Sequence, residues 1–197
     1  MRLVLASSSP RRRQLLPLLG VPFEVAEPDV EELSEGDPLE LVLRNAELKA
    51  RTVASGPAAA PGAWVLGCDT DVVADGAVLG KPVDDDGARE RLRLLAGRAH
   101  EVHSGVWLLR KGEDGTTESG EGAVETTVVR FRALSPGEID RYVATGEWKG
   151  RAGGYAVQGF GSSLIAGIEG DLSNVIGLPL PLTARLIESL QNRSEIV

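Results

Sequence analysis

Cysteine is almost absent from the sequence, and long apolar runs are missing altogether. Cys68 is the only cysteine among 197 residues, so no intramolecular disulfide can form, and we expect a cytoplasmic location with Cys68 as a small core residue. Only four apolar residues follow Met1-Arg2, which is too few for the core of a signal peptide. No stretch reaches the roughly 18 apolar residues of a membrane-spanning helix, so we expect no membrane association.

Aromatic residues and excess positive charge are also scarce. Aromatic residues make up 4% of the chain, so the core must be built from Leu, Val, Ile and Ala. The net charge of −8 argues against non-specific binding to nucleic acid, because such binding depends on neutralising phosphates. The charges are nevertheless segregated. Arg11, Arg12 and Arg13 are consecutive, whereas eight acidic and no basic residues lie between Glu24 and Glu40. A solvated surface is the alternative interpretation of each run.

Apolar spacing and turn residues predict a mixed α/β fold in a single domain spanning residues 1–197. The mixture of β-α units with hairpins favours a central mixed sheet flanked by helices, with a cleft, over a doubly wound sheet. Strands are expected at 3–6, 64–68, 100–110 and 123–132, with a hairpin over 72–79 that turns at Asp75-Gly76. Helices are expected from Pro10 to Gly20, at 38–53, at 84–95, from a capping box at 135–138 to about 145, and at 182–191.

A segment rich in serine and arginine lies between the first predicted strand and the first predicted helix. Ser7 and Ser9 offer hydroxyl donors, and Arg11 and Arg12 carry planar guanidinium groups that match a phosphate. The predicted helix N-terminus adds unpaired N–H groups and a partial positive charge. The segment therefore predicts a phosphate site. The alternative is an ordinary helix cap beside a basic surface patch.

Three further segments carry charged residues that suit a phosphate or a metal. Lys49 lies at the border of the apolar stripe of the predicted helix 38–53, where it can snorkel to solvent or point into a cleft. Asp69 directly follows the predicted strand 64–68, and strand ends are where α/β proteins place ligands. Asp71 would share a face with Asp69, and converging carboxylates can hold a divalent metal. Lys81 can reach back across the hairpin toward the same point. A polar turn after a buried strand is the alternative.

The glycine-rich segment around Gln158 suggests a loop that binds a base. Its glycines let the backbone approach a flat ligand closely, and the glutamine amide can read a base edge with one donor and one acceptor. Taken alone, residues 151–159 are better interpreted as a tight bulged hairpin.

In combination these segments resemble the Maf family of nucleotide pyrophosphatases nearly end to end. Seven motifs occur in order: LASSSPRRR from Leu5, VEE from Val30, LKA from Leu48, GCDT from Gly67, GKP from Gly80, AGGYAVQG from Ala152 and GDLSNVIGLPL from Gly170. The resemblance implies a Maf/ITPase-like fold and hydrolysis of a nucleoside triphosphate between its α and β phosphates, with Mg²⁺ or Mn²⁺ as cofactor. It leaves the oligomeric state open, with a homodimer as one option.

The resemblance also assigns roles to individual residues. Asp69 matches the aspartate taken as the proton acceptor. Arg12, Thr70 and Gln158 match positions linked to substrate choice. The remaining assignments are phosphate binding by Ser7, Ser9, Arg11, Lys49 and Lys81, and metal binding by Glu32 and Asp69. We expect Arg12 and Lys81 to face a cleft rather than the core.

The motif around Gln158 resembles the branch of the family that cleaves dTTP and UTP. The branch that acts on 7-methyl-GTP typically carries a Cys-Glu pair where this chain has Val157-Gln158.

Two alternative functions from other classes of protein remain. Asp69 to Val73 fits the D-x-D-x-V pattern of a haloacid-dehalogenase-type phosphatase, which uses an aspartate nucleophile. A non-catalytic nucleotide-binding regulator of cell division is the second.

Overall fold

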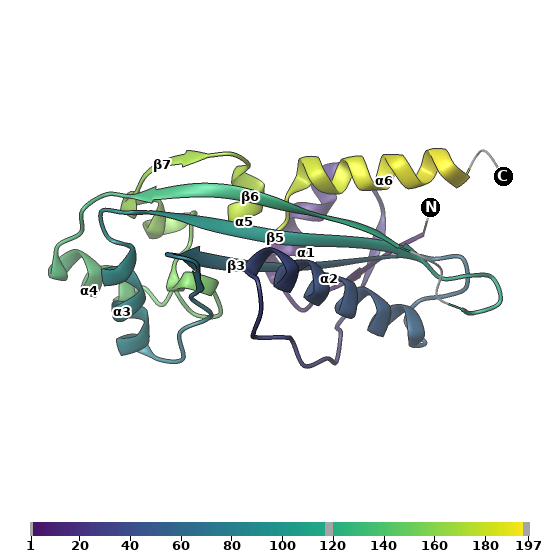
Figure 1. Ribbon diagram of the computed structural model, residues 1–197, viewed down its shortest axis with the longest axis horizontal. Coiled ribbons are helices and arrows are strands. Elements are labelled where there is room, and N and C mark those ends of the chain that lie inside the picture. Colours follow the sequence, from purple (N-terminus) through teal and green to yellow (C-terminus); the bar gives the residue numbers. More distant parts are fainter. Residues whose placement is uncertain (1, 117–119, 195–197) are drawn as a thin grey trace. The chain divides into compact units, whose positions relative to one another are not determined.

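The computed structural model describes residues 2–116 and 120–194 and divides the chain into two compact units. The first unit comprises Met1–Asp69, Ser104–Glu125 and Gly177–Val197, and the second comprises Thr70–His103 and Thr126–Ile176. Seven strands of the described residues form a mixed sheet in the order β2-β1-β3-β5-β6-β7, with β4 paired to β3 (Figure 1). The predicted mixed α/β fold is therefore confirmed. The assignment of the whole chain to one domain, with a cleft, stays a prediction.

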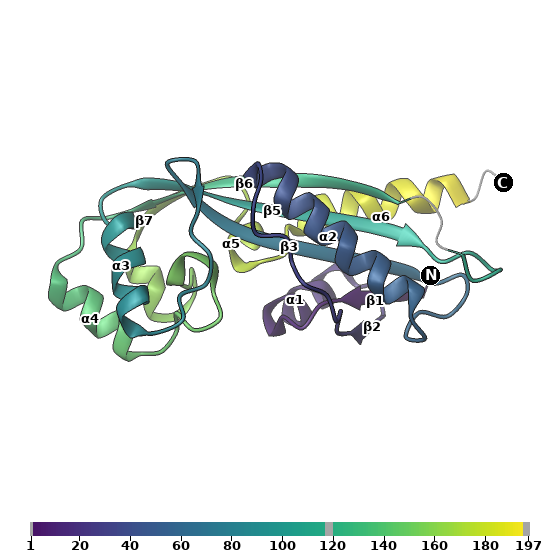
Figure 2. The ribbon, with the colours of Figure 1, turned by 60° about the horizontal axis from the view of Figure 1, so that its bottom comes forward.

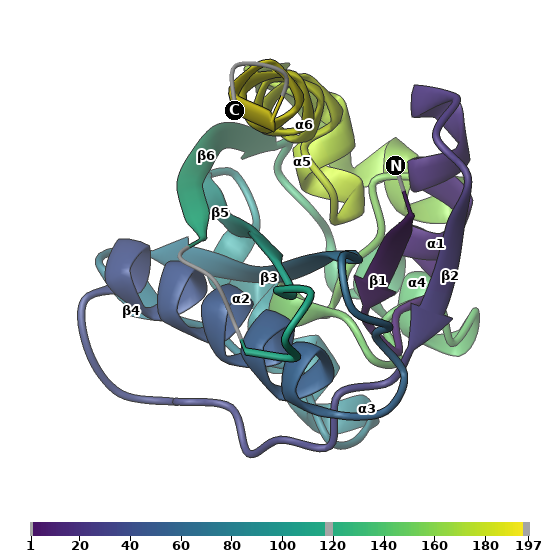
Figure 3. The ribbon, with the colours of Figure 1, turned by 90° about the vertical axis from the view of Figure 1, so that its right-hand side faces the viewer.

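The first unit combines parallel strands with three helices. Strand β1 is parallel to both β2 and β3, and Ala6 at its end pairs with Ala26 and with Gly67. Helices α2 and α6 lie on opposite sides of the strands (Figures 1 and 3). The unit contains β1 (Leu3–Ala6), α1 (Pro10–Leu15), β2 (Phe23–Ala26), α2 (Pro38–Ser55), α6 (Leu180–Ser194) and parts of the long strands β3 (Trp64–Ala74), β5 (Ala99–Arg110) and β6 (Glu121–Phe131).

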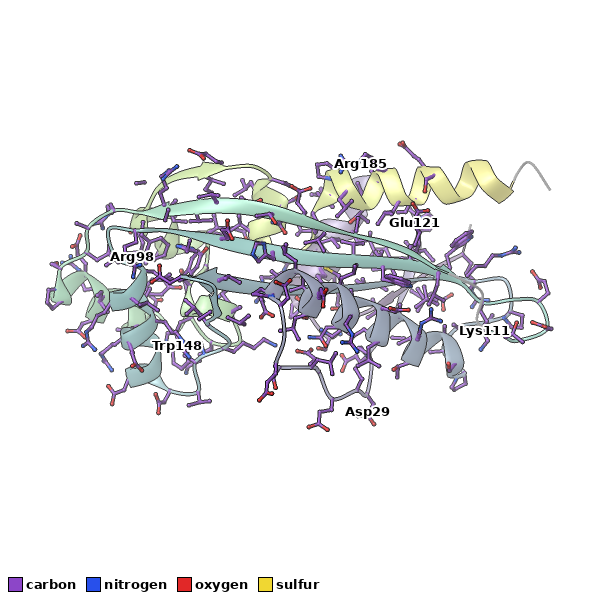
Figure 4. The ribbon with its side chains drawn as sticks, viewed as in Figure 1. Asp29, Arg98, Lys111, Glu121, Trp148 and Arg185 are labelled. Carbon is purple, nitrogen blue, oxygen red and sulfur yellow. The ribbon has the colours of Figure 1, made fainter. Side chains whose placement is uncertain are left out.

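The second unit packs helices and loops around the remaining parts of the same long strands. Its core includes Leu92, Phe131, Tyr142, Trp148 and Tyr155, so four of the chain's eight Phe, Trp and Tyr residues lie there. Arg98, labelled in Figure 4, donates from Nη2 to both carboxylate oxygens of Asp75 at 2.6 Å, at the predicted hairpin turn. Its other elements are β4 (Ala77–Val78), α3 (Asp85–Leu95), α4 (Pro136–Ala144), β7 (Ile165–Glu169) and α5 (Leu172–Ile176).

Helix α2 lies unusually close to the sheet because two strand residues facing it are glycines. A Cβ atom on Gly67 of β3 would lie 2.0 Å from the carbonyl oxygen of Ala46, and one on Gly105 of β5 would lie 2.3 Å from that of Val42. No real side chain tolerates such distances, so only glycine allows this approach. Figure 2 shows the helix lying along these strands.

The structure corrects four expectations about individual elements. The first helix is α-helical only to Leu15 and continues as a 3-10 helix over Leu16–Leu19, because Pro17 has no N–H to continue the α-helical bonding. Strand β3 runs on to Ala74, so Asp69 lies within a strand and not after its end. Strands β2 and β7 were not expected from the sequence.

Among the described residues, none of the helices has the length and the apolar character that a membrane span requires.

The close approach at Gly67 generates a test of the fold. We expect Gly67→Ala to lower the free energy of unfolding by about 1–3 kcal/mol, because the methyl group must push α2 away from β3. The matched control is Gly137→Ala in α4, where an added Cβ meets nothing within 4 Å and the backbone is helical. This control should be neutral or more stable by up to about 1 kcal/mol. Equal stability of the two variants in urea unfolding would refute the packing argument.

Candidate active site

A cluster of two carboxylates and one ammonium group lies in the first unit. Nζ of Lys49 is 2.6 Å from Oδ1 of Asp69 and 2.7 Å from Oε1 of Glu32. The side chains of Lys49 and Asp69 are 6% and 9% exposed, whereas that of Glu32 is 44% exposed. Three of the predicted site residues therefore meet at one point. The ammonium group of Lys49 is engaged by carboxylates, and its assignment to phosphate binding stays a prediction.

Asn45 belongs to the same cluster and was missed by the sequence analysis. Its Nδ2 donates to Oδ2 of Asp69 at 3.1 Å, and the side chain is buried. Asn45 precedes Lys49 by four residues on α2, so the two side chains project from successive turns of one helical face. The sequence offers one hint of this role, because Asn45 lies one helical turn before Lys49. A polar residue at the edge of the core would give the same pattern, so the hint does not identify a site residue.

The serine- and arginine-rich segment forms a second polar group in the first unit. Oγ of Ser7 accepts from the backbone N–H of Ser9 at 3.1 Å and from Nη1 of Arg12 at 3.4 Å. Nε of Arg12 donates to the carbonyl oxygen of Gly177 at 2.8 Å, which joins the first and last predicted motifs. Arg12 is only 8% exposed, so the expectation that it faces a cleft is wrong. In this buried position the guanidinium group is satisfied by its hydrogen bonds to Gly177 and Ser7.

Strand pairing places these two polar groups at the same end of the first unit. Because β1 and β3 are parallel and Ala6 pairs with Gly67, Ser7 and Asp69 both lie just beyond this pair of residues. Neighbouring strands are separated by about 4.8 Å, so a ligand of the size of a triphosphate can span both groups. Ligands commonly bind at the carboxyl ends of parallel strands, and here β1 ends at Ala6 while β3 continues past Asp69. Ser9 and Arg11 follow Ser7 on the same segment and are both partly exposed.

The second unit contains the other three predicted site residues. Thr70 is partly exposed on β3, and Lys81 and Gln158 are exposed. The segments carrying Lys81 and Gln158 are joined by a hydrogen bond from the Gly153 N–H to the carbonyl oxygen of Gly80, at 2.8 Å. The expected exposure of Lys81 is confirmed.

The loop that carries Gln158 is anchored on both sides of that residue. The Ala156 N–H donates to the hydroxyl oxygen of Tyr142 at 2.9 Å. The Phe160 and Gly161 N–H groups donate to the Glu147 carboxylate at 2.9 and 3.0 Å. Burial raises the pKa of Tyr142 to about 12, so this hydroxyl stays neutral across the working range of pH. The backbone on either side of Gln158 is thus held in place, whereas its side chain is exposed.

A buried imidazole supports the same loop. Nε2 of His100 is 2.8 Å from the Tyr155 hydroxyl, and the rings of His100, Phe131 and Tyr155 meet edge to face. Burial lowers the pKa of His100 from 6.5 to about 4. Nδ1 of His100 is buried and has no hydrogen-bond partner among the described residues, so a proton added there would lack an acceptor.

The carboxylate cluster fits a divalent cation that arrives with a substrate. Glu32 and Asp69 already share one cationic group, the ammonium of Lys49. No set of three or more His, Cys, Asp or Glu residues in the described chain could hold a metal ion by itself. Mg²⁺ is usually bound by one or two carboxylates together with substrate phosphates and water, which is the donor set that two carboxylates beside a triphosphate would provide.

Comparisons with known proteins identify the family. The model of the family described as "Maf-like protein" matches residues 2–190, so the chain belongs to the Maf family. A protein of Symbiobacterium thermophilum named dTTP/UTP pyrophosphatase is 49% identical over 188 residues, which cover 94% of this chain and 92% of that protein. One of Myxococcus xanthus with the same name is 46% identical over 188 residues, covering 94% and 91%.

A solved structure of lower similarity was also found. It is that of a protein described as nucleoside-triphosphatase / dITP/XTP pyrophosphatase from Mycobacterium abscessus. It has 16% sequence identity to this chain and a TM-score of 0.47, and the match covers 100% of this chain and 96% of the other. At this distance it contributes nothing to the interpretation of the site.

The lowered pKa of His100 predicts a pH dependence of stability. The unfolded chain binds a proton near pH 6.5 and the folded chain only near pH 4, so the contribution of neutral His100 is complete above pH 6.5 and is lost as the pH falls toward 4. The loss amounts to about 3 kcal/mol at most. We expect His100→Gln to remove this part of the slope. Parallel curves of unfolding free energy against pH for the two proteins would contradict the assignment.

Proposed function

We propose that this protein hydrolyses nucleoside triphosphates, with dTTP and UTP preferred, to the nucleoside monophosphate and pyrophosphate. The observation that carries the proposal is the convergence of Asp69, Glu32 and Lys49 just beyond the last residue pair of the parallel strands β1 and β3, where Ser7 and its partner Arg12 also lie. The names of relatives that are 46–49% identical support the reaction and the substrates. The family match favours this reaction over that of an aspartate-nucleophile phosphatase.

Asp69 is proposed to accept a proton from the attacking water. The water oxygen forms a bond to the α-phosphorus, the bond from that phosphorus to the bridging oxygen breaks, and pyrophosphate leaves with the bonding electrons. Oδ1 of Asp69 accepts a hydrogen bond from Lys49, and Oδ2 accepts one from Asn45. A carboxylate oxygen has two lone-pair directions, so Asp69 retains capacity to accept a proton.

Charge balance supports the proposed need for Mg²⁺ or Mn²⁺. Lys49 offsets only one of the two carboxylates that it contacts, so the cluster carries a formal charge of −1 and would repel a triphosphate. Glu32 and Asp69 would hold the metal, which would offset charge on the phosphates and on the leaving pyrophosphate. Ser7, Ser9, Arg11 and Lys81 are proposed to donate hydrogen bonds to the phosphate oxygens.

Gln158 is proposed to read the base. Uracil and thymine present O4 as an acceptor beside N3–H as a donor, and one glutamine amide can match both. Guanine presents the same pair at O6 and N1–H, so Gln158 alone cannot exclude it. Discrimination against purines then depends on the room beside the loop. The anchoring of this loop by Tyr142 and Glu147 limits how far its backbone can move to admit a larger base.

We expect the purified protein to convert dTTP and UTP to monophosphate and pyrophosphate when Mg²⁺ or Mn²⁺ is present. The values of kcat/KM should exceed those for CTP, GTP and 7-methyl-GTP, and excess chelator should abolish turnover. Product identification by chromatography on one preparation tests all three points. A preference for a guanine nucleotide would overturn the assigned branch. Release of orthophosphate from simple phosphoesters would point to the phosphatase, and no turnover to the regulator.

We expect Asp69→Asn to bind nucleotide while kcat falls by roughly 10²–10⁴-fold, because the amide cannot accept the proton from water. Asp71→Asn is the matched control, since only the phosphatase alternative requires both aspartates of its motif. It should lose far less activity. Thermal unfolding of each variant separates loss of chemistry from loss of fold. Near-normal kcat in folded Asp69→Asn would exclude this residue as the base.

A further inference from the structure

The amide of Asn45 makes three hydrogen bonds that connect two parts of the candidate site. Its Oδ1 accepts from the Leu33 N–H at 2.8 Å, and its Nδ2 donates to the Leu33 carbonyl oxygen at 3.0 Å. The third bond is the one to Oδ2 of Asp69, at 3.1 Å. The only donor among these partners faces Oδ1, and both acceptors face Nδ2. The three partners therefore fix the orientation of the amide.

The bonds to Leu33 hold a segment that has no regular structure of its own. Residues 27–37 form neither helix nor strand, and Figure 4 labels Asp29 on this stretch. The side chain of Asn45 hydrogen-bonds to both the N–H and the carbonyl oxygen of Leu33, as the backbone of a neighbouring β-strand would. Glu32 is the adjacent residue, and its carboxylate reaches Lys49 from there. Asn45 thus holds in place the backbone from which the side chain of Glu32 extends.

The bond to Asp69 fixes the plane of its carboxylate. Lys49 holds Oδ1 and Asn45 holds Oδ2, so rotation of the carboxylate breaks both bonds. The two donors come from successive turns of α2, which is itself held against β3 at Gly67. The Asp69 oxygens therefore have a defined direction before any substrate binds.

We propose that Asn45 is a positioning residue that aligns Asp69 and the Glu32 segment with each other, so that the two carboxylates can act on one substrate. This inference rests on the proposed function for its effect on catalysis. Its structural half, the attachment of the Glu32 segment to α2, does not depend on any activity. Asn45 contacts Asp69 and Leu33 and acts through them, without touching a reacting atom itself.

Two substitutions remove different sets of the hydrogen bonds that the amide makes. Asn45→Ala removes all three hydrogen bonds. Asn45→Asp has the same shape and keeps an acceptor for the Leu33 N–H, but it has no donor for Asp69 or for the Leu33 carbonyl oxygen, and it places a like charge beside Asp69. Thr52→Val is the matched control, because it deletes a hydrogen bond from the Thr52 hydroxyl to the Leu48 carbonyl oxygen on the same helix and lies outside the cluster.

We expect kcat for UTP to fall by about 10- to 100-fold in both Asn45 variants, while KM changes by less than about 3-fold, because misplacement of about 1 Å costs up to about 100-fold in rate. Thr52→Val should keep the kcat of the unsubstituted protein. Hydrogen exchange without nucleotide should be faster for residues 28–36 in Asn45→Ala than in the unsubstituted protein, with the protection of α2 retained.

Three results would overturn the proposal. They are an unchanged kcat in Asn45→Ala, unchanged exchange over residues 28–36, or equal loss of protection throughout α2, which would make Asn45 a general stabiliser of the fold. If the unsubstituted protein hydrolyses no nucleotide, the proposed function fails. The exchange measurement then still decides whether Asn45 holds the Glu32 segment.

Discussion

The first unit depends on the approach of helix α2 to strand β3 at Gly67. The carbonyl oxygen of Ala46 occupies the space that a side chain on residue 67 would fill. Because Asn45 and Lys49 flank this contact on the helix, and Asp69 lies two residues further along the strand, one steric condition sets the distances between all three. A glycine that packing requires therefore also determines the geometry of the charged groups beside it.

Charge in this cluster is arranged around a lysine that is nearly inaccessible. Burying an isolated ammonium group is costly, and two carboxylates compensate for it here. The exposed carboxylate, Glu32, comes from the strongly acidic segment between Glu24 and Glu40, whereas the buried one comes from the sheet. A chain with a net charge of −8 can thus approach a polyanion only through local cations, which explains why the arginine-rich segment and a metal both belong to the proposed function.

Periodicity and turn chemistry predicted most of the helices and the long strands, because each has a strong local signal. Strands β2 and β7 have only four and five residues, which is too short for a clear periodic signal, so their pairing with neighbouring strands defines them. Glu32, Lys49 and Asp69 could be named from motifs, but their meeting at one point is a tertiary fact. Asn45 escaped notice because its three partners lie 12 and 24 residues away in sequence. The burial of Arg12 likewise depends on Gly177, at the far end of the chain.

The position of Cys68 has a practical consequence for studying motion in this protein. The thiol is the only one in the chain, it is fully buried, and it immediately precedes Asp69. A thiol reagent can reach it only when this part of the first unit opens. The rate of alkylation under native conditions therefore reports how often the strand that carries Asp69 is exposed to solvent, without any introduced label.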